Sequence, residues 1–404
     1  MKHYDIIIIG GGAAGFFAAI NTAEKFPNLK IAILERGKDV LGKVKISGGG
    51  RCNVTHAEFT PKELTYNYPR GEKEILGPFH TFMTGDTMEW FDKRGVELKI
   101  EDDGRIFPVS NNSKTIIDCF LNETKKHNID ILTNQGVKDV LYASNNWHII
   151  TGADQFTATK LLVATGSSPK MWGILKKLNH TITNPVPSLF TFNCKDSRIA
   201  DIPGVVVQNV KIKVLETNLE SEGPLLITHW GFSAPSILKL SAFGALELAK
   251  LEYKFTIEIN FLNLELDTVL EDLKTIKLDE AKKTVYKFAQ FELPKRLWYK
   301  LVLDANIKED TKWADLNKQQ LDSLASQLCK AEFKIEGKST FKDEFVTAGG
   351  INLKEIDFKT YKSKKHEHLY FAGEVLNIDA ITGGFNFQNA WTSGYIVAQN
   401  IGLE

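Results

Sequence analysis

DIIIIGGGAAGFFAAI, residues 5–20, is the stretch of this 404-residue sequence that decides its fold. The run Ile6–Ile9 has the continuous apolar character of a strand that is buried on both faces. Gly10 to Gly15 predict a tight turn, and a helix is expected to follow over Phe16–Lys25. A second strand is expected over Leu29–Leu34. Because a helix connects the two strands, they must pair in parallel, which predicts an α/β fold.

The glycines fit the pattern G-x-G-x-x-G, in which each glycine has a different task. The first permits the tight turn, the second lets the backbone approach a pyrophosphate, and the third allows close packing of helix and strand. Glu35 lies twenty residues after Gly15, where a carboxylate can accept hydrogen bonds from both ribose hydroxyls. This context disfavours the alternative of a glycine turn without a ligand. It predicts a dinucleotide site at the helix N-terminus formed by Gly10, Gly12, Ala13, Ala14, Gly15, Glu35 and Arg36.

Two later segments favour FAD over NAD as the dinucleotide. Leu161–Gly166 is a strand that ends in Ala-Thr-Gly, a common return to the nucleotide domain in flavoproteins. Leu369–Glu374 is a strand that ends in an acidic residue, and Thr382–Gly384 and a helix over Phe387–Ile401 follow it. The N-terminus of that helix would face the pyrimidine edge of a flavin, where negative charge develops on reduction. No second G-x-G-x-x-G occurs, so a separate NAD domain is not expected.

The segment KISGGGRCNVT, residues 45–55, is the most distinctive part of the sequence. From Lys43 to Asn53 we expect a loop that wraps against a ligand, with Arg51 near phosphate and Asn53 able to donate and accept hydrogen bonds. A solvated flexible loop is the alternative. Cys52 beside Arg51 could be a reactive thiol, but a packed cysteine is favoured because no second cysteine lies near to resolve it.

Together these segments resemble the BaiN/YhiN-like (aminoacetone-oxidase-like) family of FAD-dependent flavoproteins. The resemblance extends over nearly the whole chain, and its segments are residues 8–15, 47–55, 103–108, 226–233, 347–351 and 373–394. It implies a Rossmann-like FAD-binding domain of the two-dinucleotide type, interrupted by an insert. We expect the FAD-binding domain over 1–187 and 340–404, a β-barrel-like domain over 188–265 and a helical segment over 266–339. His56, Asn377 and Ala380 depart from the family pattern, which has Asn, Asp and Gly there.

The resemblance also implies a set of cofactor contacts outside the glycine turn. These are Lys45, Ser47, Gly50, Arg51, Cys52, Asn53, Val137, Ala164, Thr165, Gly166, Gly373, Glu374, Gly383, Gly384, Phe385, Asn386 and Phe387. No catalytic residue is assigned. His229 could orient a substrate or pass a proton, although a structural role at a domain junction is the preferred interpretation. Arg105 is interpreted as part of a packing corner, and contact with an anionic substrate is the alternative.

Composition excludes several other classes of protein. Fifty basic and fifty acidic side chains give no net charge, so we expect neither nucleic acid nor membrane as a partner. We identify no basic stripe interleaved with aromatic residues. The four cysteines form no CxxC, which argues against a dithiol relay and against a metal site. The N-terminus shows no signal peptide, and we expect a cytoplasmic protein.

These observations predict an FAD-dependent oxidoreductase that transfers a hydride between a small organic substrate and flavin. NAD(P)H, as a transient co-substrate, or oxygen is the expected second redox partner. An FAD-dependent RNA-modifying protein and a low-turnover flavin-binding regulator are the alternatives. Neither the substrate nor the oligomeric state is assigned.

Overall fold

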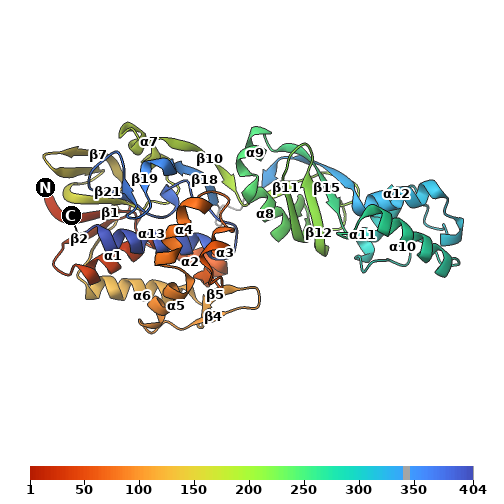
Figure 1. The fold of residues 1–404 in the computed structure, drawn as a ribbon, viewed down its shortest axis with the longest axis horizontal. Coiled ribbons are helices and arrows are strands. Elements are labelled where there is room, and N and C mark those ends of the chain that lie inside the picture. The colour runs from red at the N-terminus through yellow and green to blue at the C-terminus, as the bar shows by residue number, and fades with distance from the viewer. Residues whose placement is uncertain (340–345, 404) are drawn as a thin grey trace. The chain divides into compact units, whose positions relative to one another are not determined.

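The computed structural model describes residues 1–339 and 346–403, which form two compact units (Figure 1). The first unit consists of Met1–Val186 together with the C-terminal segment that starts at Val346. The second unit starts at Pro187 and contains the residues between those two segments. The expected domain boundary at residue 340 lies outside the described residues.

A parallel sheet forms the core of the first unit. Its central strands lie in the order β21 (Leu369–Phe371), β9 (Gln155–Val163), β1 (Lys2–Ile9), β2 (Ile31–Leu34) and β6 (Asp130–Leu132), and every neighbouring pair is parallel. The four isoleucines of β1 are at most 4% exposed, as the apolar run predicted. The predicted α/β class and parallel pairing are therefore confirmed.

Helices α1 (Ala13–Lys25) and α13 (Phe385–Asn400) pack closely against each other, although they stand at opposite ends of the chain. Gly394 makes this approach possible. A Cβ atom at Gly394 would lie 2.9 Å from the backbone oxygen of Ala14 and 3.2 Å from the backbone nitrogen of Ala18. The two ends of the sequence thus share one helical layer (Figure 1).

Further short elements complete the first unit. Strands β7 (Val137–Ala143) and β8 (Asn146–Thr151) continue the sheet from β9, and β19 (Ile356–Asp357) and β20 (Lys362–Ser363) extend it beyond β21. Strands β3 (Thr55–His56), β5 (Arg105–Pro108) and β4 (Leu98–Ile100) form a separate small sheet. The remaining helices are α2 (Gly42–Gly50), α3 (Pro61–Thr65), α4 (Glu72–Thr81), α5 (Thr84–Asp92), α6 (Ser113–Lys126) and α7 (Pro169–Lys177), with the 3-10 helices η2 (Leu353–Glu355) and η3 (Gly373–Val375).

The second unit contains a small antiparallel barrel, as the resemblance led us to expect over residues 188–265. Its strands lie in the order β16 (Ala331–Glu336), β15 (Lys254–Asn260), β12 (Val206–Val214), β13 (Glu220–Thr228), β14 (Gly231–Ser233), β11 (Thr191–Asn193) and β17 (Lys338–Ser339). Only Gly337 separates β16 from β17, which stand at the two edges of this order, so the sheet closes on itself. The chain leaves and re-enters the first unit through the paired strands β10 (Ile182–Ser188) and β18 (Val346–Ile351).

Helices pack against this barrel and extend from it. They are α8 (Pro235–Phe243), α9 (Ala245–Lys250), α10 (Leu266–Asp279), α11 (Lys295–Asp304), η1 (Trp313–Asp315) and α12 (Lys318–Cys329). One expectation is wrong here. Residues 331–336 form β16 instead of continuing the helical segment, because their alternate side chains are buried in the barrel. Ser233 ends β14, and the residue before α8 is Ala234, which caps the helix with no side-chain hydrogen bond.

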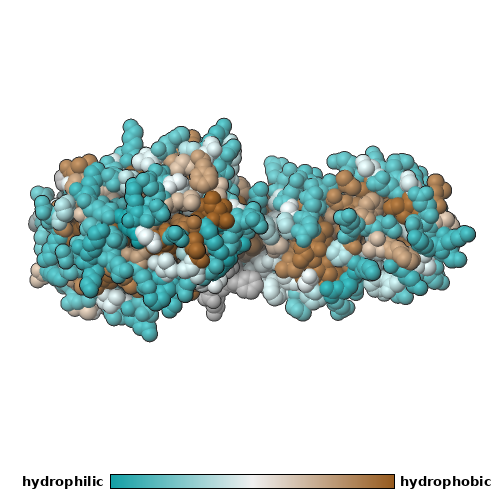
Figure 2. Space-filling view, turned by 90° about the horizontal axis from the view of Figure 1, so that it is seen from below, coloured by the Kyte–Doolittle hydropathy of each residue, from teal (hydrophilic) through white to brown (hydrophobic). Residues whose placement is uncertain are grey.

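Among the described residues, no helix is both long and apolar enough to cross a bilayer. The face drawn in Figure 2 is mostly hydrophilic, and apolar areas appear on both units.

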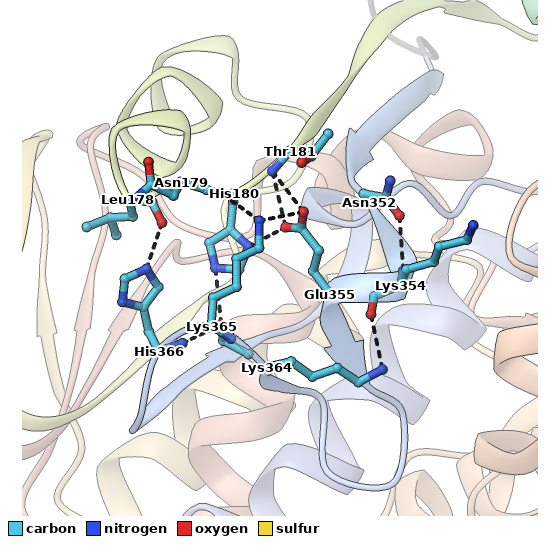
Figure 3. Close-up of polar contacts among 11 residues, drawn as sticks. Leu178, Asn179, His180, Thr181, Asn352, Lys354, Glu355, Lys364, Lys365 and His366 are labelled. Atoms are coloured by element: carbon cyan, nitrogen blue, oxygen red, sulfur yellow. Dashed lines mark hydrogen bonds and ion pairs between the residues drawn. The ribbon is translucent and has the colours of Figure 1, made fainter.

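A buried polar network ties the segment after α7 to the hairpin of β19 and β20 (Figure 3). The carboxylate of Glu355 accepts hydrogen bonds from Nζ of Lys365 at 2.7 Å and from the backbone N–H of Thr181 at 3.1 Å, and its Oε2 lies 2.8 Å from Nδ1 of His180. Nε2 of that histidine lies 3.1 Å from the hydroxyl of Ser363. Burial opposes the charge of Glu355, but these hydrogen bonds outweigh it and lower the pKa of the carboxyl to about 2. Burial also lowers the pKa of His180, although Glu355 opposes that shift.

Replacing Glu355→Gln is expected to destabilise the protein at neutral pH, with an effect that shrinks in acid. The pKa of the folded state lies below the ordinary value of 4.5, so the charged carboxylate stabilises the fold above that pH. The side chain is 12% exposed, and the shift corresponds to at most about 3 kcal/mol. Urea unfolding should show that the unchanged protein has a higher free energy of unfolding than Glu355→Gln at neutral pH. This difference should narrow as pH falls from about 4.5 toward 3. Glu367→Gln, at an exposed position, is the control, and a pH-independent difference for Glu355→Gln would contradict the assignment.

Candidate functional site

Four turns lie side by side at the carboxyl edge of the parallel sheet. The register pairs Ile9 with both Leu34 and Val163, and Val163 with Phe371, so β1, β2, β9 and β21 end at the same level. The turns that follow them are Gly10–Gly12, Glu35–Gly37, Ala164–Gly166 and Ala372–Glu374. A crevice at this edge is where open α/β sheets bind their ligands. The structure therefore brings together segments that the sequence placed hundreds of residues apart.

The three motif glycines have distinct surroundings. Gly10 has a φ of +117°, and a Cβ there would lie 2.4 Å from the backbone oxygen of Ala164. At Gly15 a Cβ would lie 2.1 Å from the oxygen of Gly10. A Cβ on Gly12, by contrast, would meet nothing within 4 Å. Gly10 and Gly15 are thus required by packing, whereas Gly12 keeps open the space before the N-terminus of α1, where Ala13 and Ala14 begin the helix.

Glu35 lies at the end of β2 and holds the glycine turn in place. Its carboxylate accepts hydrogen bonds from the backbone N–H of Gly11 at 2.9 Å and of Gly37 at 2.8 Å, one on each oxygen. Each carboxylate oxygen keeps a second lone pair for a ligand. The backbone N–H of Gln135 donates to the backbone oxygen of Glu35, which brings the start of β7 with buried Val137 to this edge. Arg36 is exposed beside this segment.

The segment expected as a loop over 43–53 is in part helical. Helix α2 covers Gly42–Gly50 with a kink in which Ser47 is extended and Gly48, Gly49 and Gly50 have φ of +56°, +68° and +83°. The helical pattern was missed because three consecutive glycines strongly disfavour a helix. Lys45 is exposed, and its backbone oxygen accepts a hydrogen bond from the hydroxyl of Ser113 at 2.8 Å.

Arg51 and Cys52 take part in packing. The guanidinium of Arg51 lies 3.8 Å from the centre of the Phe107 ring and pairs with Glu101 at 2.7 Å. Cys52 is fully buried, and burial raises the pKa of its thiol to about 12. The reactive-thiol alternative is therefore excluded by the fold. Arg105 pairs with Asp103 at 2.7 Å, in line with a packing corner.

The C-terminal turn packs directly on the segment that follows Arg51. Gly384 has a φ of +98°, and a Cβ there would lie 2.6 Å from the backbone oxygen of Thr55 and 2.9 Å from Oδ1 of Asn53. Nδ1 of His56 lies 3.0 Å from the backbone oxygen of Gly383, and its ring stacks on Phe385 with 4.5 Å between centroids. These contacts place residues 53–56, including β3, against the N-terminus of α13.

The other predicted C-terminal residues surround this contact. The backbone N–H of Gly373 donates to the hydroxyl of Ser393 at 3.0 Å, and Glu374 pairs with Lys43 at 2.6 Å. A Cβ on Gly166 would lie 3.6 Å from Oε2 of Glu374. Oδ1 of Asn386 accepts a hydrogen bond from the backbone of Ala380 at 3.0 Å, and the Phe387 ring stacks on Trp391.

Sequence reasoning missed one buried ion pair beside this turn. Arg70 binds both carboxylate oxygens of Asp379, which is fully buried. The two residues are 309 positions apart, so no local pattern could have linked them. Lys43 was likewise missed as the partner of Glu374.

The residues at this edge fit a flavin dinucleotide. Oδ1 of Asn53 and Oγ1 of Thr165 are buried and have no hydrogen-bond partner among the described residues. Buried polar atoms normally have one, and a ligand at this edge could supply it. The open space at Gly12 and the free lone pairs of Glu35 suit a pyrophosphate and a ribose. The N-termini of α1 and α13 both favour the negative charge that a flavin dinucleotide brings.

Two further features belong to other elements of the chain. Glu24, Glu123 and His127 could bring three ligand atoms together for a metal ion, but Arg94 already pairs with both glutamates, so we assign no metal there. His229 belongs to the second unit, where it is exposed in the turn between β13 and β14. Its role stays a prediction.

Comparisons with known proteins agree with this architecture. The family model described as HI0933-like protein Rossmann domain matches residues 4–400. The chain is 27% identical to the ribosomal RNA dihydrouridine synthase of Haemophilus influenzae, with 100% of both chains covered. It is 26% identical to the 3-dehydro-bile acid delta(4,6)-reductase of Clostridium scindens, with 97% of each covered. It is also 26% identical to the ribosomal RNA dihydrouridine synthase of Escherichia coli, with 99% of this chain and 98% of the relative covered.

Solved structures share the fold at much lower identity. The 3-ketosteroid delta1-dehydrogenase of Sterolibacterium denitrificans matches with a TM-score of 0.51 and 12% identity over 99% of both chains. The 3-ketosteroid-delta4-(5alpha)-dehydrogenase of Rhodococcus jostii matches with a TM-score of 0.50 and 12% identity over 98% of this chain and 97% of that one. Their likeness concerns the fold alone.

Replacing Gly12→Ala is expected to weaken binding of FAD without destabilising the protein. The added methyl group meets no protein atom within 4 Å, and Gly12 has an ordinary φ of −99°. It would, however, stand where the backbone must approach a pyrophosphate. We expect a loss of affinity for FAD of about tenfold or more, measured by titration of the apoprotein and equivalent to at least about 1.4 kcal/mol.

Gly77→Ala is the matched control, because a Cβ there also meets nothing within 4 Å and the residue lies on α4, away from the glycine turn. Equal FAD affinities of the Gly12→Ala and Gly77→Ala proteins would show that the pyrophosphate does not lie at this turn.

Proposed function

Because this chain belongs to the HI0933-like family of Rossmann-type FAD-binding proteins and is an FAD-dependent oxidoreductase, we propose that it reduces a carbon–carbon double bond conjugated to a carbonyl group. The observation that carries the proposal is the match to three relatives over nearly their whole lengths. Their names describe two substrates, a steroid and a uracil base, but one kind of reaction. In each, a double bond conjugated to a carbonyl gains two hydrogen atoms.

FAD, when bound, would accept a hydride from NAD(P)H and pass it to the β-carbon of the conjugated system. The protein has to bind the cofactor, shield it and supply one proton to the α-carbon. The N-terminus of α1 would hold the pyrophosphate and Glu35 the ribose. The N-terminus of α13 would favour the negative charge of the reduced pyrimidine ring.

The site offers no thiol relay that could carry electrons elsewhere. Cys52 is buried with a raised pKa, and all four cysteines are buried and free. A direct transfer between the cofactor and an organic substrate is therefore the simplest route. This argument supports hydride transfer over disulfide reduction.

His56 is the residue that we propose to hold the proton for the substrate. Its Nδ1 can donate to the oxygen of Gly383, which fixes the ring beside the turn expected to contact the flavin. Its Nε2 makes no hydrogen bond with the described residues, so that atom of the imidazolium form would be available to donate a proton to the substrate. His229, in the second unit, is the other candidate.

A uracil base within RNA is the second candidate substrate, beside a small organic enone. Two of the three relatives bear the name ribosomal RNA dihydrouridine synthase, which favours this alternative. The chain also contains a basic and aromatic segment over residues 281–300, which the net charge of zero conceals. Both substrates require the same chemistry at the flavin.

Anaerobic reaction with an enone tests the proposal. The FAD-loaded protein should lose its absorption band near 450 nm with NADPH or NADH and regain it when a small conjugated enone or free uridine is added. His56→Asn should slow the return of the band by about 10²-fold while leaving its loss unchanged. His229→Asn is the comparison and should change neither step. Reoxidation by oxygen alone, with no response to any enone, would contradict the proposal.

A further inference from the structure

The segment AKKTVYKFAQFELPKRLWYK, residues 281–300, is strongly basic within a chain of zero net charge. It carries six cationic side chains and one acidic side chain, and five aromatic residues stand among them. Basic side chains interleaved with aromatic ones are typical of nucleic-acid binding. The expectation that no such stripe exists is therefore wrong, because net charge over the whole chain hides it.

The fold places this segment on the surface of the second unit. Helix α11 buries Leu297 and Trp298 and exposes Lys295 and Arg296 on the opposite face. The indole N–H of Trp298 donates to the backbone oxygen of Val285 at 2.8 Å, which ties the connection before α11 to the helix. The connection and the helix therefore form one surface.

Aromatic contacts define how that surface is arranged. The ring of Tyr286 lies 4.3 Å from that of Tyr299, which stands one turn after Lys295 on α11. Lys287 and Phe288, which follow Tyr286 directly, must therefore lie close to the exposed face of the helix. Phe288 is 47% exposed, so its ring is accessible to a partner.

The charges of this surface are mostly unmatched. Within the described residues, no acidic side chain pairs with any of the four exposed cations Lys282, Lys287, Lys295 and Arg296. Lys283 pairs with Glu280 and also lies 5.2 Å from the Phe288 ring. Of the acidic neighbours, Glu309 accepts a hydrogen bond from Tyr299, and Glu292 is exposed. The balance around Phe288 is positive.

We propose that this surface, made of Lys282, Lys287, Phe288, Lys295 and Arg296, binds single-stranded RNA. Cations at this spacing can neutralise successive phosphates, and an exposed ring among them can stack on an unpaired base. Bases that an enzyme must reach in RNA lie in single-stranded loops, where such stacking is available. The inference rests on the proposed function, because RNA is a substrate only if the reduced double bond belongs to a uracil.

Binding of a fluorescent, uridine-rich RNA of about 16 nucleotides to the FAD-loaded full chain tests the proposal. A variant with Lys282→Gln, Lys287→Gln, Lys295→Gln and Arg296→Gln should bind at least about tenfold more weakly. The slope of log affinity against log salt concentration should become less negative by about 3, because each of the four lost phosphate contacts contributes roughly 0.7 to that slope. Phe288→Ala alone should weaken binding by about tenfold while keeping the slope, since it removes stacking and no charge.

A matched control removes four other exposed lysines of the same unit that have no acidic partner within the described residues, namely Lys239, Lys250, Lys254 and Lys334, each changed to Gln. This control should bind RNA as the unchanged protein does. Equal losses in both quadruple variants, or no binding of RNA by the unchanged protein, would overturn the proposal. Equal or stronger binding to phosphatidylserine-containing vesicles, lost in the same variant, would overturn it in favour of a membrane.

Reduction of a small enone separates this inference from the proposed function. The quadruple variant should reduce a small enone at the unchanged rate, and so should the separate Phe288→Ala variant. Loss of RNA binding with that rate retained supports the surface. Intact RNA binding without enone or uridine reduction would leave the surface standing and contradict the proposed function.

Discussion

The rest of the site depends on one constraint, which is that β1, β2, β9 and β21 all end at the same level of the sheet. Parallel pairing forces their carboxyl ends to one edge, and the turns that follow must then share a small space. The backbone oxygen of Ala164 can approach Gly10 this closely only because Gly10 has no side chain. The same holds for the backbone of Thr55 at Gly384. The insertion of a whole second unit between β9 and β21 does not disturb this edge. A flavin dinucleotide is long enough to use every one of these turns.

Much of this arrangement was predictable from sequence because it depends on local rules. A buried apolar strand, a glycine turn and an acidic residue after the next strand follow from backbone geometry, and all three lie where they were expected. The resemblance to a known family also led us to expect the antiparallel sheet of the second unit. Helix α2 was not predicted because three consecutive glycines disfavour a helix. Gly48, Gly49 and Gly50 form its last turn with left-handed φ values. The continuation of a helix over 331–336 was wrong because burial in the barrel outweighed local propensity.

Long-range pairs could not be predicted in the same way. Arg70, which lies just before α4, meets Asp379 only because the fold brings it to the C-terminal turn. In the same way Arg51 pairs with Glu101 and lies over the Phe107 ring. The network of Glu355 with His180 is of the same kind. The basic segment over 281–300 is different, since every residue of it was visible in the sequence. It was overlooked because total charge averages over units that can have different partners.

The central claim is that three separate parts of the chain form one FAD site at the edge of the sheet. A crystal structure of the protein with FAD tests it most directly. The account predicts one FAD per chain, with the pyrophosphate at Gly12, a ribose on Glu35 and the flavin ring against Asn53 and the N-terminus of α13. A colourless protein that takes up no FAD, or a cofactor bound away from these residues, would contradict it.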